Sequence, residues 1–379
     1  MIKVLLVDQN NAIAWKYTYS LANALQKQGV NISVITDLQS EKGFCKPEII
    51  KIFNTDQKGI SKVDKLKNYV SGYKKIITII KEQKFDILHL QWITFSPVDY
   101  YFLKKISKLC KVVMTVHDII AFDAHCYDKI YYKKVYGLMD ELILQTEENV
   151  EQFKTLFPKV NSTKIHLCYH GHFLDFANVH GKAESREKLS LPKDKFIFMF
   201  FGQIKKVKGV DLLIQAFADV LKKYPNSYLL IAGKVWHNNF NPYQGLIEKL
   251  QLKDFVRTDI KFIPDEDVGY YFSACDIVCL PYTELYQSGV VQLSYSYKKP
   301  AIVSDLPAFL TVVKEQENGY VFKNGNIQSL SEAMNKAIEN KDCLESLGQI
   351  GYQFIKDKFD WDKIAGKVVN IYANQNDKK

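Results

Sequence analysis

The chain has 379 residues, a length that fits two domains of ordinary size. With 47% hydrophobic and 25% charged residues, it is neither a largely disordered nor a collagen-like chain. Lysine and arginine number 51 against 42 acidic residues, a net charge of +9, and only Arg186 and Arg257 are arginines. Proteins that recognise nucleic-acid bases commonly use arginine, so this lysine-rich surplus argues against nucleic acid as a partner. It suits an anionic surface, a phosphate-bearing small molecule or a plain solvated surface.

Targeting and redox signals point to the cytoplasm. No apolar run reaches the roughly 18 residues of a membrane-spanning helix, since Ile2–Val7 and Phe196–Phe201 are only strand-sized. The first apolar run ends at Asp8, so we expect no signal peptide. The seven cysteines lack CxxC spacing, and we interpret them as reduced side chains of a cytosolic protein.

Strand-sized apolar runs alternate with amphipathic helices along the chain, which is typical of parallel sheets with crossover helices. The first half contains the predicted strands Ile2–Val7, Asn31–Thr36, Asp86–Gln91, Val112–Val116, Glu141–Gln145 and Lys164–Cys168. The second half contains Phe196–Phe201, Tyr228–Ala232, Lys261–Ile263, Asp276–Leu280, Ala301–Ser304 and Gly319–Phe322. The polar stretch Asn178–Lys195 is the candidate linker. We therefore predict two doubly wound α/β domains, whose ligands bind at the carboxyl ends of the strands.

One predicted helix, Ser61–Lys81, is amphipathic and basic. Its apolar stripe is flanked by five lysines; the stripe consists of Val63, Leu66, Val70, Tyr73, Ile77 and Ile80, and the lysines are Lys62, Lys65, Lys67, Lys74 and Lys75. Either this stripe packs on the sheet as in an ordinary surface helix, or it lies on anionic lipid.

The strongest local motif is FFGQIKKVKGVDLLIQAF, Phe200–Phe217. A predicted strand ends at Gly202, and Gly209 opens a long amphipathic helix. Between them, Lys205, Lys206 and Lys208 place ammonium groups beside a helix N-terminus, an arrangement that favours phosphate. An ordinary exposed lysine loop would have the same spacing.

A second motif, LPYTELYQSGVVQLSYSYKKPAIVSD, follows a later strand. Ser288 is placed to cap a helix whose first amides, those of Gly289 and Val290, would face an anion. Glu284 lies in the preceding loop, where a carboxylate suits sugar hydroxyls better than phosphate. The alternative is a plain helix cap with a solvent-exposed glutamate.

Together these two motifs resemble the C-terminal domain of the GT-B glycosyltransferases of family 4, which are retaining, metal-independent and use nucleotide sugars. MTVHDI (Met114–Ile119) resembles the family's T-x-H, and CYHGHF (Cys168–Phe173) resembles its P-H-G with Tyr169 in place of proline. FDWDKIAGKVVNIY (Phe359–Tyr372) is similar to the closing segment of the family. The resemblance extends over most of the chain and implies a deep cleft between two Rossmann-like domains.

The resemblance also implies roles for single residues. Lys208 is similar to the lysine that neutralises the donor diphosphate, and Lys205 would replace the arginine that the family commonly has where this chain has Gln203. His117 would contact the donor sugar near the reacting centre. Glu284 would hold sugar hydroxyls, whereas the second acid of the family's E-x7-E pair is here Gln292. The motif Q-S-G-V, residues 287–290, is similar to that of a subset of the family associated with exopolysaccharide and capsule assembly.

The resemblance implies a retaining, metal-independent glycosyltransferase without cofactor or metal site. It would move a sugar from a nucleotide-diphosphate sugar to a glycan or polyprenyl-linked acceptor in surface polysaccharide or glycolipid assembly. We expect an acceptor domain over residues 1–178, to which a helix at 361–376 returns, and a donor domain over 195–357. The enzyme would be cytoplasmic and could associate with the inner face of the membrane. The alternatives are a noncatalytic nucleotide-sugar-binding partner subunit, suggested by Gln292, and a GT-B nucleotide-sugar epimerase.

Overall fold

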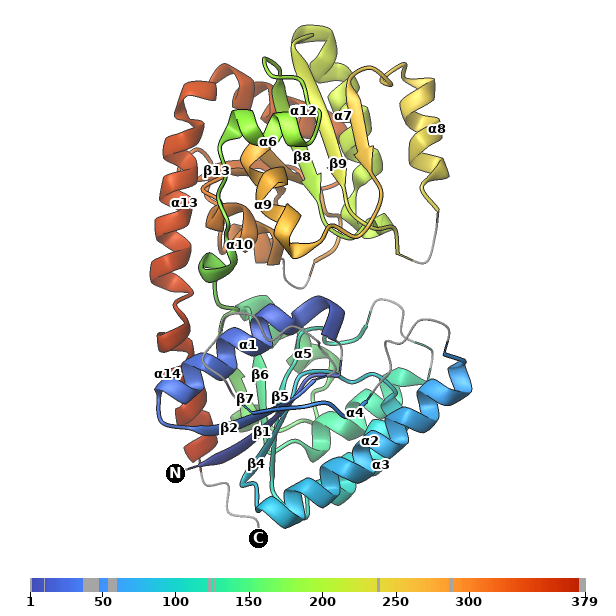
Figure 1. Ribbon diagram of the computed structural model, residues 1–379, viewed down its shortest axis with the longest axis vertical. Coiled ribbons are helices and arrows are strands. Elements are labelled where there is room, and N and C mark those ends of the chain that lie inside the picture. The colour runs from blue at the N-terminus through green and yellow to red at the C-terminus, as the bar shows by residue number, and fades with distance from the viewer. Residues whose placement is uncertain are drawn as a thin grey trace. The chain divides into compact units, whose positions relative to one another are not determined.

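A computed structural model describes residues 2–9, 11–36, 48–53, 60–121, 125, 127–236, 239–285 and 289–374 of the chain. The chain divides into two compact units (Figure 1). The first unit consists of Met1–Gly171 together with Phe359–Lys379, and the second is His172–Lys358. Each unit contains one parallel sheet flanked by helices, which confirms the predicted fold class.

The first unit is built on a parallel sheet with the strand order β3-β2-β1-β4-β5-β6-β7. Its strands are β1 (Lys3–Val7), β2 (Asn31–Ile35), β3 (Glu48–Ile50), β4 (Ile87–Leu90), β5 (Lys111–Thr115), β6 (Glu141–Leu144) and β7 (Ile165–Leu167). Its helices are α1 (Asn11–Lys27), α2 (Lys62–Gln83), α3 (Ser96–Ile106), α4 (Asp128–Leu138), α5 (Glu147–Leu156) and α14 (Trp361–Ala373). The central strands are buried on both faces, which explains their continuous apolar sequence.

The last helix of the chain, α14, belongs to the first unit and lies beside α1 (Figure 1). Its apolar face shares a core cluster with α1, and Trp361 is only 6% exposed. A methyl group at Gly171 would lie 2.2 Å from the Trp361 ring, so the absence of a side chain there lets the indole pack. His170 next to it packs against Tyr17.

The second unit has a parallel sheet with the strand order β10-β9-β8-β11-β12-β13. Its strands are β8 (Phe196–Phe201), β9 (Ser227–Ala232), β10 (Val256–Asp259), β11 (Ile277–Leu280), β12 (Ala301–Ser304) and β13 (Gly319–Phe322). Its helices are α6 (Lys182–Lys188), α7 (Val210–Lys223), α8 (Asn241–Lys249), α9 (Asp265–Ala274), α10 (Gly289–Ser296), α11 (Pro307–Leu310), α12 (Ile327–Glu339) and α13 (Leu344–Lys358).

Two predictions about the second unit are wrong. The strand expected at Lys261–Ile263 is instead β10, Val256–Asp259, an edge strand that is only partly buried and therefore lacks an apolar run. The expected linker Asn178–Lys195 contains α6, which packs against α9. The polar composition of α6 concealed this packing, because Arg186 is buried and donates to the Ala274 carbonyl and to Asp276.

The face of α2 that the structure buries differs from the predicted apolar stripe by a rotation about the helix axis. The buried side chains on α2 are Tyr69, Tyr73, Ile76 and Ile80. Both tyrosine hydroxyls donate to the buried Asp99 at 2.6 Å, a nonlocal contact that selects this face. Val63 and Leu66 remain 62% and 40% exposed, so the first turns of α2 present apolar side chains to solvent.

Candidate functional site

Each sheet has a point where strand order reverses, and the predicted site residues follow strands at or near these points. In the first unit β1 lies between β2 and β4; in the second, β8 lies between β9 and β11. Loops that leave neighbouring carboxyl ends in opposite directions open a crevice there, where ligands of doubly wound sheets bind. We describe the site in each unit separately.

In the second unit, the loop after β8 is held between the loops that follow its two neighbouring strands. The Ile204 amide donates to the Lys234 carbonyl at 3.0 Å, and the Thr283 amide donates to the Val207 carbonyl at 2.9 Å. Gly202 has a φ of +126°, and a methyl group at Gly233 would lie 1.9 Å from the Gly202 carbonyl oxygen. The two glycines thus allow a close backbone approach at the strand ends.

The same loop ends at Gly209, which opens α7. Gly209 has a φ of +63°, and a methyl group there would lie 1.9 Å from the Pro281 carbonyl oxygen, so only glycine fits. Because the N-cap residue is Gly209, it has no side chain that could accept from the first amides of α7. The first amides of a helix carry partial positive charge and bind anions, so α7 begins as an anion-binding helix should.

Two lysines of this loop lie over aromatic rings. The Lys205 ammonium is 4.9 Å from the Trp236 ring centre, and the Lys208 ammonium is 3.6 Å from that of Tyr282. Such cation–π contacts hold an ammonium group without neutralising its charge. Both lysines belong to the loop that leads into α7, where positive charge favours phosphate.

The second motif approaches the first through Val290. The Val290 Cγ2 atom would lie 3.5 Å from a methyl group at Gly202, so the first turn of α10 adjoins the end of β8. Gly289 is the first residue of α10, and Ser288 lies outside the described residues. Gln292 is buried at 4% exposure, and its Oε1 atom has no hydrogen-bond partner among the described residues.

Two further residues predicted for this site, Glu284 and Gln203, lie in loops at the ends of strands. Glu284 is exposed in the loop after β11, and Gln203 is half-buried in the loop after β8. The structure thus brings Gly202, Gly209 and Val290 together at one strand edge with the two lysines. Trp236 and Tyr282, which the lysines contact, escaped sequence analysis, although each follows a predicted buried strand by only a few residues.

In the first unit, His117 lies two residues beyond β5. Its Nε2 atom is 2.9 Å from Gln91 Oε1, its ring stacks on Trp92 with centres 4.5 Å apart, and the Tyr17 ring meets it edge-on at 4.9 Å. Burial, reinforced by the charges of His170 and His89, lowers the pKa of His117 to about 3. The imidazole is therefore neutral at pH 7, and with Gln91 Oε1 accepting from Nε2, its Nδ1 atom is the acceptor.

Uncharged polar atoms gather around this histidine. At the ends of neighbouring strands, Gln9 (Oε1), Gln91 (Nε2), Trp92 (Nε1) and Gln145 (both amide atoms) have buried atoms without a hydrogen-bond partner among the described residues. They follow β1, β4 and β6, which together with β5 are consecutive strands of the sheet. Because buried polar groups are normally paired, this concentration marks a ligand site. Amides, an indole and a neutral imidazole suit an uncharged, hydroxyl-bearing ligand.

Sequence analysis found His117 but missed these neighbours. Gln91 and Gln145 are each the first polar residue after a buried strand, a signal that could have identified both. Among the described residues, no group of three or more His, Cys, Asp or Glu side chains is arranged to hold a metal ion. No helix in the described part of the chain has the length and apolar character that a bilayer crossing requires.

Comparisons with known proteins agree with this two-unit architecture. A family model described as "Glycosyl transferase 4-like" matches residues 3–146, and one described as "Glycosyl transferases group 1" matches residues 181–354. Spore coat protein SA of Bacillus subtilis (strain 168) is 25% identical over 314 residues, covering 77% of this chain and 79% of that protein. The O-antigen biosynthesis glycosyltransferase WclY of Escherichia coli is 23% identical over 369 residues, covering 93% and 97%.

Solved structures show the fold. The crystal structure of Anabaena Alr3699/HepE in complex with UDP and glucose superposes with a TM-score of 0.77 at 16% identity, covering 98% of this chain and 99% of that chain. The predicted GT-B architecture of two Rossmann-like domains is thereby confirmed. The chain is a glycosyltransferase, with a glycosyl transferase 4-like domain over residues 3–146 and a group 1 glycosyl transferase domain over residues 181–354.

Proposed function

We propose that this glycosyltransferase transfers a sugar, with retention and without a metal ion, from a nucleotide-diphosphate sugar to a glycan or lipid-linked acceptor. The observation that carries the proposal is the loop after β8, in which Lys205 and Lys208 lie over aromatic rings and Gly209 begins α7 without a capping side chain of its own. The Anabaena protein was crystallised with UDP and glucose, and WclY is named for O-antigen biosynthesis. The first supports a nucleotide-sugar donor, and the second supports a role in surface polysaccharide or glycolipid assembly.

In the proposed reaction the donor diphosphate lies at the N-terminus of α7. As the sugar–phosphate bond breaks, negative charge grows on the leaving diphosphate. The helix amides and the ammonium groups of Lys205 and Lys208 stabilise that charge where it develops, which is the largest contribution such a site can make. Two fixed ammonium groups and a helix terminus supply the positive charge that a metal ion supplies elsewhere.

The surroundings of His117 favour retention by front-face attack. Among the described residues, the side chains that contact its ring include Gln91, Trp92 and Tyr17, which are uncharged and cannot act as a carboxylate nucleophile. In a front-face reaction the acceptor hydroxyl attacks from the side on which the diphosphate leaves. The Nε2 atom of Gln91 and the amide of Gln145 would hold sugar hydroxyls, and neutral His117 would accept one through Nδ1.

We also propose that the first unit docks on the inner face of the membrane, where a lipid-linked acceptor would be held. Large apolar side chains are exposed on three of its helices: Val63 and Leu66 on α2, Tyr101 on α3 and Ile130 on α4. Lys62, Lys65 and Lys67 lie on the same turns of α2 as Val63 and Leu66. Exposed apolar groups beside lysines suit an anionic lipid surface.

Gln292 favours a second candidate function, a noncatalytic subunit that binds nucleotide sugars. An amide in place of the family's second acid leaves a buried Oε1 atom without a partner among the described residues. Such a subunit would bind the donor without releasing nucleoside diphosphate. Turnover therefore separates the two functions.

Lys208→Ala tests the proposal, with Lys206→Ala as the matched control. Lys206 belongs to the same loop but is exposed to solvent. Nucleoside diphosphate release is measured with UDP- and GDP-sugars in the presence of membrane extract as acceptor source. We expect Lys208→Ala to lower the rate by about 10²–10³, Lys205→Ala to lower it less, and Lys206→Ala to leave it unchanged. Equal rates for the wild type and folded Lys208→Ala would refute the phosphate site, and donor binding without any release would favour the noncatalytic subunit.

A further inference from the structure

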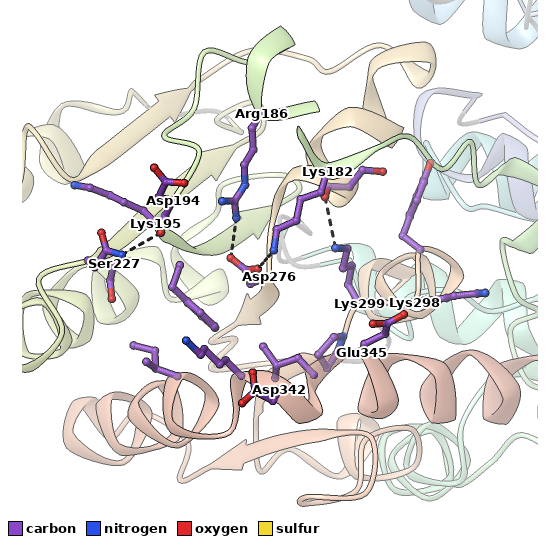
Figure 2. A pocket seen from close by; sticks show the side chains of 18 of the residues that line it. Lys182, Arg186, Asp194, Lys195, Ser227, Asp276, Lys298, Lys299, Asp342 and Glu345 are labelled. Carbon is purple, nitrogen blue, oxygen red and sulfur yellow. Dashed lines mark hydrogen bonds and ion pairs between the residues drawn. The ribbon is translucent and has the colours of Figure 1, made fainter. Parts of the chain in front are cut away.

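The second unit contains a large open cavity at the edge of the sheet opposite to the donor loop (Figure 2). Its volume is about 1390 Å³, and it is lined by the segments that lead into the amino ends of β8, β9, β11 and β12. The loop with Lys205 and Lys208 leaves the carboxyl end of β8. The cavity is therefore separate from the proposed donor site, and neither the proposed reaction nor the comparisons assign it a ligand.

Positive charge exceeds negative charge in the lining of this cavity. Eight lysine and arginine side chains and four aspartate and glutamate side chains line it. On one wall, Lys182, Arg186 and Lys299 gather near a single carboxylate, Asp276 (Figure 2). Lys182 is 2.5 Å and Arg186 2.9 Å from the carboxylate oxygens of Asp276, which also accepts from the Ile197 amide at 2.7 Å. Lys182 and Arg186 share this one carboxylate, and with Lys299 the wall has a surplus of two positive charges.

The two lysines of this wall are held in place yet keep donors for a ligand. The Lys299 ammonium donates to the Cys275 carbonyl at 2.8 Å and to the Ser273 carbonyl at 3.5 Å, at the end of α9. An ammonium group has three protons, and Lys182 directs one of them to Asp276. Because these contacts already order both side chains, little further side-chain entropy is lost when a ligand binds to the two lysines.

An unpaired buried hydroxyl lines the same cavity. Ser227 is 1% exposed at the start of β9, and its Oγ atom has no hydrogen-bond partner among the described residues. A buried hydroxyl is normally paired, so this atom points to a missing partner. An acceptor oxygen on a ligand in the cavity could take its proton.

We propose that this cavity is a second ligand site, which binds a small molecule carrying two or more phosphate charges. One phosphate would meet Lys182 and Lys299, and the exposed lysines of the lining, among them Lys298 and Lys341, would attract a second. The acids at the rim, Asp194, Asp342 and Glu345, would repel a continuous polyanion but accept from hydroxyl groups (Figure 2). A phosphorylated sugar therefore suits the lining better than inorganic polyphosphate.

The test is calorimetric titration of the full chain with fructose 1,6-bisphosphate and, separately, with inorganic tripolyphosphate. Each titration is repeated with saturating UDP and with the Lys208→Ala variant, because either probe could enter the donor loop. We expect one site for the sugar bisphosphate that persists under both conditions. Lys182→Gln should weaken it about tenfold, whereas Lys249→Gln, on α8 and outside the cavity lining, should leave it unchanged.

Several outcomes would overturn the proposal. Binding abolished by UDP or by Lys208→Ala would place the probe in the donor loop, and equal affinity in Lys182→Gln would exclude the cavity. If circular dichroism shows that Lys182→Gln is not folded, Lys298→Gln on the exposed rim replaces it and should weaken binding at least threefold. Binding of tripolyphosphate alone would contradict the phosphorylated-sugar assignment, whereas preference for the sugar bisphosphate would support it.

Discussion

Lowering the pH from 8 to 5.5 should destabilise the first unit, because three of its histidines are buried in the neutral form. Burial lowers the pKa of His89 to about 3, and that of His170 to about 4. His117 has a pKa lowered to about 3 by burial and by the neighbouring histidines. In the unfolded chain each titrates near ~6.5. Between these values the unfolded state binds more protons than the folded state, so the free energy of unfolding decreases as the pH decreases.

The size of the effect follows from these pKa values. At pH 5.5 each histidine costs about 1.4 kcal/mol of unfolding free energy relative to pH 8. Asp99 acts in the opposite direction, since burial raises its pKa to about 6 and the folded state takes up a proton there. At pH 5.5 this carboxyl group therefore increases the free energy of unfolding by about 0.8 kcal/mol relative to pH 8. The net expectation is a loss of about 3 kcal/mol in the first unit.

Tryptophan fluorescence can report on this unit alone. Of the four tryptophans, Trp15, Trp92 and Trp361 belong to the first unit and only Trp236 to the second. Urea unfolding of a Trp236→Phe variant, followed at pH 8, 6.5 and 5.5, therefore measures the first unit. His89→Gln provides the control, because it removes one buried titrating group and should reduce the pH dependence by about 1.4 kcal/mol. An unfolding midpoint that does not change between pH 8 and 5.5 would refute the assignment of three neutral histidines.

Three further predictions concern the glycine turn, the metal and the membrane. Gly209→Ala should destabilise the second unit by at least about 1–2 kcal/mol, because Gly209 has a left-handed backbone, and it should raise the KM for the donor. Gly245→Ala is the control, since open space surrounds Gly245, and it should have neither effect. Equal melting temperatures for the two variants would contradict the role of Gly209 in the turn. EDTA should leave sugar transfer unchanged, and activity that is lost with EDTA and restored by manganese would overturn the metal-independent mechanism. The wild type should sediment with anionic but not neutral vesicles at low salt, and binding should weaken at high salt. If the wild type stays in solution with anionic vesicles, membrane docking is refuted. A variant with five lysines of α2 replaced by glutamine should bind these vesicles more weakly; the replaced lysines are Lys62, Lys65, Lys67, Lys74 and Lys75.

Most of the fold could be predicted because parallel strands are buried on both faces. Such strands are continuous apolar runs, so Phe196–Phe201 was predicted with the bounds that the structure has for β8. The turn glycines Gly202 and Gly209 were also recognisable, since the chain reverses direction directly after a strand. Edge strands lack this signal. β10 was misplaced because Arg257 and Asp259 pair with each other on a partly exposed strand.

The candidate site could be predicted only in part. His117 and the lysines of the loop after β8 were identified by their position after strands and by family resemblance. The amide cluster of Gln91 and Gln145 was missed, because a glutamine after a strand gains meaning only beside the polar residues of neighbouring strands. The order β1-β4-β5-β6, which brings them together, is a property of the sheet and not of any segment.

The sequence by itself determined the alternation of strands and helices, the glycine turns and the positive charge at the start of α7, all of which depend on neighbours along the chain. Only the tertiary structure decided which polar groups find partners. It buried Arg186 against Asp276 and turned α2 so that Tyr69 and Tyr73 reach Asp99. It also left Ser227 unpaired in the cavity at the amino ends of the strands. The physical reason is that burial makes an unpaired polar group costly, and its partner can come from any distance along the chain.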